Sequence, residues 1–270
     1  MSESMSGVGK GPVGLDTQKP ETLNPLQVLT ALQSGPGRWG EGLGALARGL
    51  NVNTTFIQGG SEHFQEMREN LNTKPGIAIA NHPTPFDSCF VFQALNRNDI
   101  LLVLAAEWSA YASQIMGQKH ILAAPHDEEA MEKGNQRVTE HISAGGLLVM
   151  FPSAYMEKSA SQLRFKSGFR HFVSKIAPDN MVYAFNIDPD VAPTLRTHIL
   201  GKAEPADKVI QVALGVSLRP MPQPTEIKVN ESYSTAAEWQ KIISDSTALP
   251  SDQQNELLAK HFLEKTAFPH

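Results

Sequence analysis

The stretch at residues 76–92, GIAIANHPTPFDSCFVF, constrains the fold more than any other part of the chain. Residues 77–80 form a short apolar run, which indicates a buried strand. An asparagine and two prolines break this run and indicate a turn. Asp87 or Ser88 follows as a candidate helix N-cap, before apolar residues that favour a short helix. The sequence therefore predicts a strand, a rigid polar turn and a helix, with His82 and Asp87 held at the mouth of a sheet.

Length and composition limit the class of protein. The chain has 270 residues, enough for one large α/β domain or two small ones with a sizeable core. Hydrophobic residues make up 41% and charged residues 19%, as in ordinary globular proteins. The net charge of -5 argues against a general nucleic-acid binder, because there is no basic excess to neutralise phosphates. A single cysteine, Cys89, excludes an internal disulfide framework and fits a reducing compartment.

No segment of the sequence resembles a membrane span or a secretory signal. The longest apolar runs, residues 100–106 and 147–151, fall far below the roughly 18 residues that a spanning helix needs. Residues 1–22 are rich in Gly, Ser, Pro and Lys, which is typical of a disordered tail. We therefore expect a cytoplasmic protein, with at most peripheral contact at the inner face of a membrane.

Hydrophobic periodicity predicts alternating strands and helices over most of the remaining chain. The expected strands are residues 54–57, 77–80, 100–105, 121–123, 147–151, 181–187, 209–218 and 225–229. The expected helices are residues 62–71, 108–116, 128–142, 169–176, 236–243 and 255–263, after two short helices within residues 26–50 that form an N-terminal cap. This alternation favours an α/β fold with a mixed, largely parallel central sheet flanked by helices. We expect one domain over residues 23–270.

His82 and Asp87 are the first candidates for catalysis. A carboxylate on one ring nitrogen of a histidine fixes its tautomer, so that the other nitrogen can accept a proton from a hydroxyl or an amine. The pair suits direct attack by a bound acceptor on an activated acyl group, because no protein nucleophile accompanies it. The alternative from spacing alone is that His82 caps the strand end and Asp87 caps the helix.

A second stretch supplies basic residues. Residues 147–152 read as a buried strand stopped by a proline, and residues 164–170, RFKSGFR, open a helix after a loop that contains Lys158. A helix N-terminus beside Lys and Arg is a natural anion site. A solvated basic loop is the alternative.

Taken together, the two stretches resemble the glycerol-phosphate and lysophosphatidate acyltransferase family. Its first signature, Asn-His-x4-Asp after a strand, is matched by Asn81, His82 and Asp87. Its later signature runs Phe-Pro-Glu-Gly-Thr-Arg-Ser, then a variable loop and Phe-Lys-x-Gly at a helix start. Here Phe151-Pro152 and the residues Phe165, Lys166, Ser167 and Gly168 match it, and the similarity covers roughly residues 50–190.

The chain also departs from the family. Where the family has Glu-Gly-Thr-Arg-Ser, residues 153–157 read Ser-Ala-Tyr-Met-Glu. In the family this Glu and Arg help to hold the glycerol-phosphate acceptor, and Arg is the group best suited to bidentate phosphate binding. The intermediate block, here residues 120–126, lacks its usual Arg, and residues 182–186 lack the proline of the last block.

The resemblance implies an acyltransferase that uses an acyl-CoA or acyl-carrier-protein thioester as co-substrate and no further cofactor. His82 is the expected general base and Asp87 its orienting group. The expected substrate-binding residues are Asn81, Phe151, Pro152, Ser153, Lys158, Arg164, Lys166 and Gly168. The basic ones, together with Arg170, could face the donor's phosphates or an acidic carrier protein. The departures favour an alcohol or amine acceptor other than glycerol phosphate, and a phospholipid-precursor acyltransferase is the second interpretation.

Other interpretations are weaker. The chain has no Gly-x-Ser-x-Gly elbow, which disfavours a Ser-His-Asp hydrolase. Cys89 is expected to be packed and inert rather than nucleophilic. A metal site would draw on His82, Asp87, His120, His126 and Asp127, but these lack a recognisable ligand spacing. A non-catalytic acyl- or lipid-binding module stays open, as does a role for residues 26–50, with Trp39, and 108–116 as walls of an acyl groove.

Overall fold

The computed structural model describes residues 47–58, 73–84, 87–106, 116–124, 127–157, 163–188 and 221–268, with isolated residues between these segments. Its strands are β1 (Val52–Gln58), β2 (Gly76–Ala80), β3 (Ile100–Leu104), β4 (Ile121–Ala123), β5 (Leu147–Met150), β6 (Met181–Ile187) and β7 (Thr225–Thr235). Its helices are α4 (Asp87–Leu95), the 3₁₀ turn η1 (Gln118–His120), α6 (Glu128–Ser143), α7 (Ser167–Val173), α10 (Ala236–Asp245) and α11 (Ser251–Lys265).

The strands form one sheet in the order β1-β7-β6-β2-β5-β3-β4. The five strands from β6 to β4 are mutually parallel, whereas β7 pairs antiparallel to β6 and parallel to β1. The expected α/β fold with a mixed, largely parallel sheet is therefore confirmed. Because β6, β2 and β5 lie next to one another and parallel, their carboxyl ends meet at one edge of the sheet.

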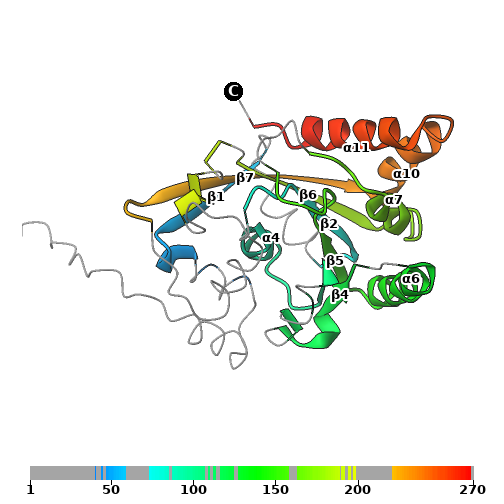
Figure 1. Cartoon of the computed structure of the whole chain (residues 1–270), viewed down its shortest axis with the longest axis horizontal. Helices are drawn as coiled ribbons and strands as arrows, with labels where there is room; N and C mark the ends of the chain where they lie inside the picture. The colour runs from blue at the N-terminus through cyan, green and yellow to red at the C-terminus, as the bar shows by residue number, and fades with distance from the viewer. Residues whose placement is uncertain are drawn as a thin grey trace, which may run out of the picture.

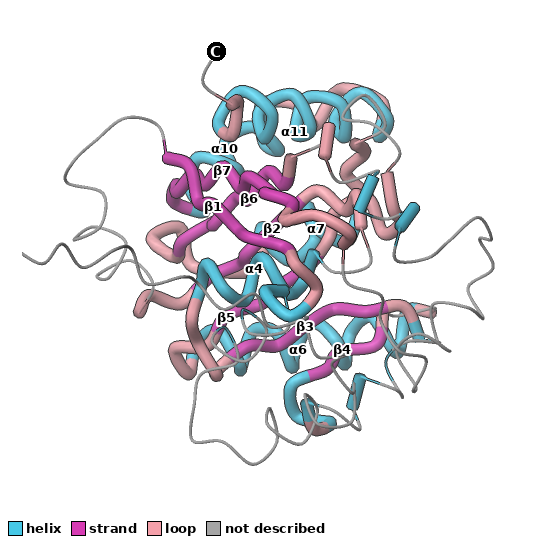
Figure 2. Tube along the Cα trace, turned by 90° about the vertical axis from the view of Figure 1, so that its left-hand side faces the viewer, coloured by secondary structure: helices cyan, strands magenta, loops and turns pink. Residues whose placement is uncertain are grey.

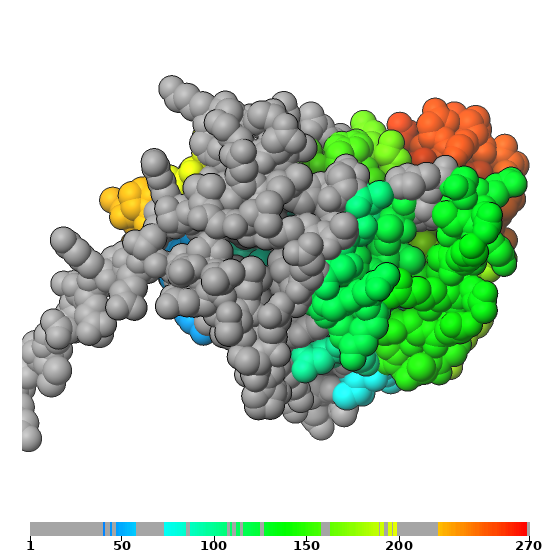
Figure 3. All heavy atoms as spheres, turned by 60° about the horizontal axis from the view of Figure 1, so that its bottom comes forward, coloured from blue at the N-terminus to red at the C-terminus, as the bar shows by residue number. Residues whose placement is uncertain are grey.

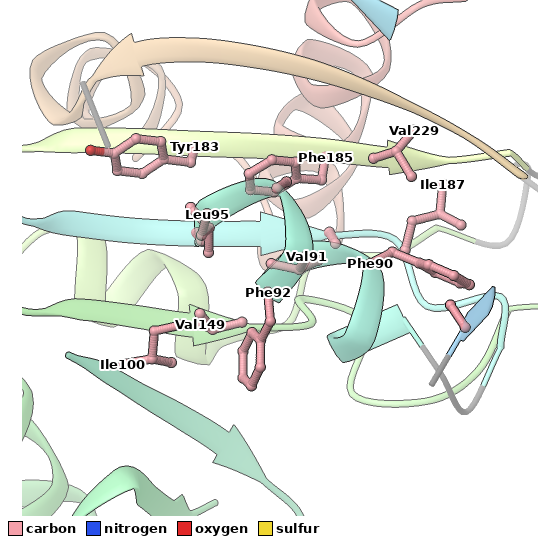
Figure 4. Close-up of a cluster of buried hydrophobic side chains, with 14 of the residues drawn as sticks. Phe90, Val91, Phe92, Leu95, Ile100, Val149, Tyr183, Phe185, Ile187 and Val229 are labelled. Carbon is pink, nitrogen blue, oxygen red and sulfur yellow. The ribbon is translucent and has the colours of Figure 1, made fainter. Parts of the chain in front are cut away.

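Helices cover both faces of this sheet. On one face α4 packs against the central strands, and Figures 1 and 2 show it lying across β2. Figure 4 shows its apolar side chains, among them Phe90, Val91 and Leu95, directed at residues of the neighbouring strands. The other face carries α6, α7, α10 and α11. In the space-filling view, the orange C-terminal helices and the green segment that contains α6 make up one side of the molecule (Figure 3).

Burial on both faces explains the sequence of the central strands. All residues of β2, β5 and β6 are buried, which requires near-continuous apolar runs instead of alternation. The helix α6 shows how local signals set the ends of an element. The Asp127 side chain accepts a hydrogen bond of 2.8 Å from the Ala130 amide at its start, and Gly145 adopts a φ of 93° just after its end.

The structure corrects one strand. Residues 225–229 were expected as a short strand, but β7 continues to Thr235. The polar residues Asn230, Glu231 and Ser232 ended the apolar pattern, yet they stay in register with Asn186, Phe185 and Ala184 of β6. Antiparallel pairing with β6 therefore overrides the weak local pattern.

Several expected elements lie outside the described residues. These are the tail at residues 1–22, the helices at 26–32 and 62–71, the strand at 209–218, half of the helix at 39–50 and most of the helix at 108–116. The helical residue Gly40 belongs to the expected N-terminal cap and lies against α4, since a Cβ there would come within 2.5 Å of the Phe92 carbonyl oxygen. None of the described helices has the length and hydropathy needed to cross a membrane.

Candidate active site

The turn that carries the candidate base begins where β2 ends. Asn81 is 4% exposed, and its amide side chain donates to the Ile187 carbonyl over 2.8 Å and accepts from the Ile187 amide over 2.6 Å. These two bonds fasten the turn to the end of β6. The structure thus shows a structural link at Asn81, while a substrate contact of this residue stays a prediction.

His82 and Asp87 face each other across the turn. His82 Nδ1 lies 2.7 Å from Asp87 Oδ2, and the His82 side chain is 25% exposed whereas Asp87 is fully buried. The ring nitrogen next to the carboxylate is therefore the Nδ1, which leaves Nε2 as the nitrogen able to exchange a proton with a substrate. Sequence spacing suggested this geometry, and the structure brings the two side chains together.

Thr84 completes the surroundings of the Asp87 carboxylate. Its amide donates to Oδ2 over 2.8 Å, and its hydroxyl donates to Oδ1 over 2.6 Å. Burial raises the pKa of the Asp87 carboxyl, while the hydrogen bonds from His82 and Thr84 act in the opposite direction. These contacts aim the carboxylate back at the turn.

The loop at residues 151–157, which follows β5, lies against His82. The rings of Phe151 and His82 stack with centroids 4.5 Å apart and an interplanar angle of 26°. Glu157, which is 3% exposed, accepts a hydrogen bond of 2.7 Å from the His82 amide and donates its own amide to the His82 carbonyl over 2.9 Å. The loop and the turn are thus joined directly at the candidate base.

Glu157 is the residue of this site that sequence reasoning missed. Its neighbours in sequence give no sign of the contact, because His82 lies 75 positions earlier. The sequence did contain one signal for this contact, which is that Glu and Ser have exchanged places relative to the family signature. The family signature has Glu first and Ser fifth after Phe-Pro, whereas this chain has Ser153 first and Glu157 fifth. Burial raises the pKa of the Glu157 carboxyl, and the bonds from Ser153 and the His82 amide counter that effect.

Ser153 and Pro152 close the loop onto the segment that precedes α7. The Ser153 hydroxyl is fully buried, donates to Glu157 Oε1 and accepts a 3.2 Å hydrogen bond from the Arg164 amide. The Pro152 carbonyl accepts a 2.9 Å bond from the Lys166 amide. Gly168 lies in the first turn of α7, which runs Ser167–Val173 and so begins before the expected residue 169 and ends before residue 176.

The basic residues do not share one environment. Arg164 and Lys166 are exposed next to the loop, and the Lys166 ammonium lies 5.6 Å from the centre of the Tyr155 ring. Arg170 instead donates to Ser251 over 2.6 Å and to Gln254, which links α7 to α11. Lys158 lies outside the described residues. Arg164 and Lys166 therefore stay the candidates for binding an anionic group beside the turn.

Two alternatives from the sequence are not supported by the described contacts. No three His, Cys, Asp or Glu side chains of the described part of the chain gather as metal ligands would. His120 Nδ1 lies 3.0 Å from the Ile100 carbonyl, Asp127 caps α6, and His126 lies outside the described residues. Cys89 is buried, and burial together with the charge of Asp87 raises the pKa of its thiol to about 12, which makes it a poor nucleophile.

Comparison with known proteins supports the resemblance. Residues 62–190 match the model of the acyltransferase family. The fold is similar to that of the 1-acyl-sn-glycerophosphate (LPA) acyltransferase PlsC from Thermotoga maritima, with a TM-score of 0.50 and 11% sequence identity over 91% of this chain and 83% of that chain. No protein of curated function matches the sequence. The matched region contains both the turn of His82 and the loop of Glu157.

Proposed function

We propose, from the match of residues 62–190 to the acyltransferase family model, that the protein transfers a fatty acyl group from an acyl-CoA or acyl-carrier-protein thioester to an alcohol or amine. The observation that carries the proposal is the 2.7 Å contact between His82 Nδ1 and the buried Asp87 carboxylate. A pair with a buried orienting group and a partly exposed imidazole is suited to general-base catalysis.

The reaction needs one proton acceptor and one leaving group. His82 Nε2 takes the proton from the acceptor's hydroxyl or amine, whose oxygen or nitrogen bonds to the thioester carbonyl carbon. The carbon–sulfur bond then breaks, and the proton passes from His82 to the departing thiolate. Asp87 stabilises the imidazolium that forms between these steps, because its carboxylate already lies at Nδ1.

The developing oxyanion needs hydrogen-bond donors near the turn or the loop. Four backbone amides there already donate elsewhere, namely those of His82, Thr84, Ala154 and Glu157. Pro83 and Pro152 have no amide hydrogen. The oxyanion donor of this mechanism is therefore another amide of the turn or of residues 153–156.

The acceptor proposed here is not glycerol phosphate. At the place of the signature Arg the loop has Met156, which is partly exposed, beside the exposed Tyr155. An apolar side chain there cannot form the bidentate hydrogen bonds with which Arg binds phosphate. Arg164 and Lys166 then serve the phosphates of the thioester donor or the acidic surface of a carrier protein.

A lysophosphatidate-type activity is the second candidate. It is favoured by the exposed positions of Arg164 and Lys166 next to the loop, where they could replace the missing Arg. The two candidates differ in their acceptor and share the His82 mechanism, so one assay separates them.

The test is thiol release from long-chain acyl-CoA and from acyl-carrier protein by the purified chain, with separate pools of alcohols, amines and lysophospholipids. We expect acceptor-dependent release, reduced by about 10²- to 10⁴-fold in His82→Ala because the general base is lost. His141→Gln is the matched control, since His141 lies near the end of α6, before the amino end of β5. Release with lysophospholipids alone would support the second candidate. Bound acyl-CoA without any release would contradict both and favour a binding module.

A further inference from the structure

His82 is held from two sides, its backbone by the loop at residues 151–157 and its ring by Asp87 at the start of α4. Glu157 Oε2 accepts from the His82 amide over 2.7 Å, and the Glu157 amide donates to the His82 carbonyl over 2.9 Å. One residue thus contacts both the N–H and the C=O of His82. On the side of the helix, the Asp87 carboxylate contacts the ring of His82 and accepts from the Thr84 amide.

The second oxygen of Glu157 is also occupied. Oε1 accepts from the Ser153 hydroxyl, and Ser153 Oγ in turn accepts from the Arg164 amide over 3.2 Å. Glu157 and Ser153 are 3% and 0% exposed, so water cannot readily replace either bond. A buried carboxylate with both oxygens bonded has one orientation, because any rotation would leave a buried donor without an acceptor.

We propose that Glu157 is a positioning residue for His82, which sets the backbone of the base while Asp87 sets its ring. Ser153 fixes the Glu157 carboxylate in the orientation that this requires. The inference deepens the proposed function and rests on it, because it assigns a role in the same reaction to a residue that does not touch the substrate. The placement of the base matters, since shifts of about 1 Å can lower a rate by about 10²-fold.

The conservative variant separates geometry from charge. In Glu157→Gln the amide oxygen can still accept from the His82 amide, and the NH₂ group can donate to Ser153 Oγ. In Glu157→Ala both buried donors lose their acceptor. A positioning role therefore predicts that Glu157→Gln keeps most of the catalytic rate and that Glu157→Ala does not. Glu231→Gln is the matched control, because Glu231 is also buried and accepts from a hydroxyl, that of Tyr233.

The first measurement needs no substrate. In a chain labelled with ¹⁵N-histidine, the His82 amide signal is identified by its loss in His82→Ala. A charge-assisted hydrogen bond shifts an amide proton downfield, so the signal should move partly upfield in Glu157→Gln and further in Glu157→Ala. Glu231→Gln should leave it unchanged. An unchanged His82 signal in Glu157→Gln and Glu157→Ala would overturn the proposal. If Glu157→Ala does not fold, the signal in Glu157→Gln decides.

The second measurement is the rate of thiol release. We expect kcat to fall about 10- to 100-fold in Glu157→Ala and less than about fivefold in Glu157→Gln, with KM changed less than about threefold in both. A rise in KM at constant kcat would overturn the proposal, since it would indicate a substrate contact. If the wild-type chain transfers no acyl group at all, the proposed function fails, and the amide signal still reports whether Glu157 holds His82.

Discussion

The turn at residues 81–87 and the loop at residues 151–157 serve the same histidine in different ways. The turn keeps every residue of the acyltransferase signature that it resembles, and the contacts around its His82–Asp87 pair are local, since His82 and Asp87 are five positions apart and Thr84 and Asp87 three. The loop has lost most of its signature, and its contacts to His82 span 75 positions. The loop nonetheless contacts His82 through stacking and two hydrogen bonds.

This difference separates two kinds of constraint. The proposed proton transfer depends on an imidazole whose tautomer is fixed by a carboxylate, so both side chains of this pair have to be kept. Holding a backbone amide requires only an acceptor within reach, which different residues can supply. The turn therefore tolerates few residue types at its functional positions. The loop tolerates more residue types, provided that the same hydrogen bonds are formed.

The largest effect should come from Asp87→Asn, which keeps the size of the side chain in the turn. Three donors, from His82 and from the amide and hydroxyl of Thr84, converge on Asp87. An Asn side chain that keeps its oxygen at the Oδ2 position can still accept from His82 Nδ1 and from the Thr84 amide, but it has no charge to stabilise the imidazolium that forms during proton transfer. We expect kcat to fall about 10²- to 10³-fold in the thiol-release assay, because the base remains but its imidazolium loses the neighbouring charge. A loss below tenfold would show that the turn does not require a carboxylate at position 87.

The same contrast explains what the sequence could predict. The strand, turn and helix around His82 follow from apolar runs and prolines within 17 residues, and α6 follows from Asp127 and the glycines after Ala144. Glu157 was not predicted, because its partner is remote in sequence and a charged residue in a loop normally faces solvent. The last six residues of β7 were missed for a related reason, since their pairing with β6 is a tertiary contact.

The intermediate effect should come from exchanging the loop pair. Ser153→Glu alone brings two buried carboxyl groups together, and Glu157→Ser alone leaves the His82 amide without its acceptor. We expect each single variant to lower kcat about 10- to 100-fold. The double variant should have a kcat about tenfold higher than that of either single variant. The exchange restores the residue order of the family signature. Purely additive losses in the double variant would mean that the two positions act independently, and that the loop is limited in residue types after all.

The smallest effect should come from Cys89, which follows the turn by two residues but has no part in its chemistry. Burial and the neighbouring Asp87 charge raise the pKa of its thiol to about 12, so the thiol stays protonated near neutral pH. We expect an aromatic disulfide reagent to label the native chain at least about 100-fold more slowly than the urea-unfolded chain, because the thiol is both buried and protonated. Cys89→Ala, which also gives the labelling background, should keep kcat within about twofold, since it removes a single buried sulfur atom. Rapid labelling of the native chain, together with loss of thiol release in the labelled protein, would place Cys89 in the reaction. The functional residues would then extend from the turn into α4.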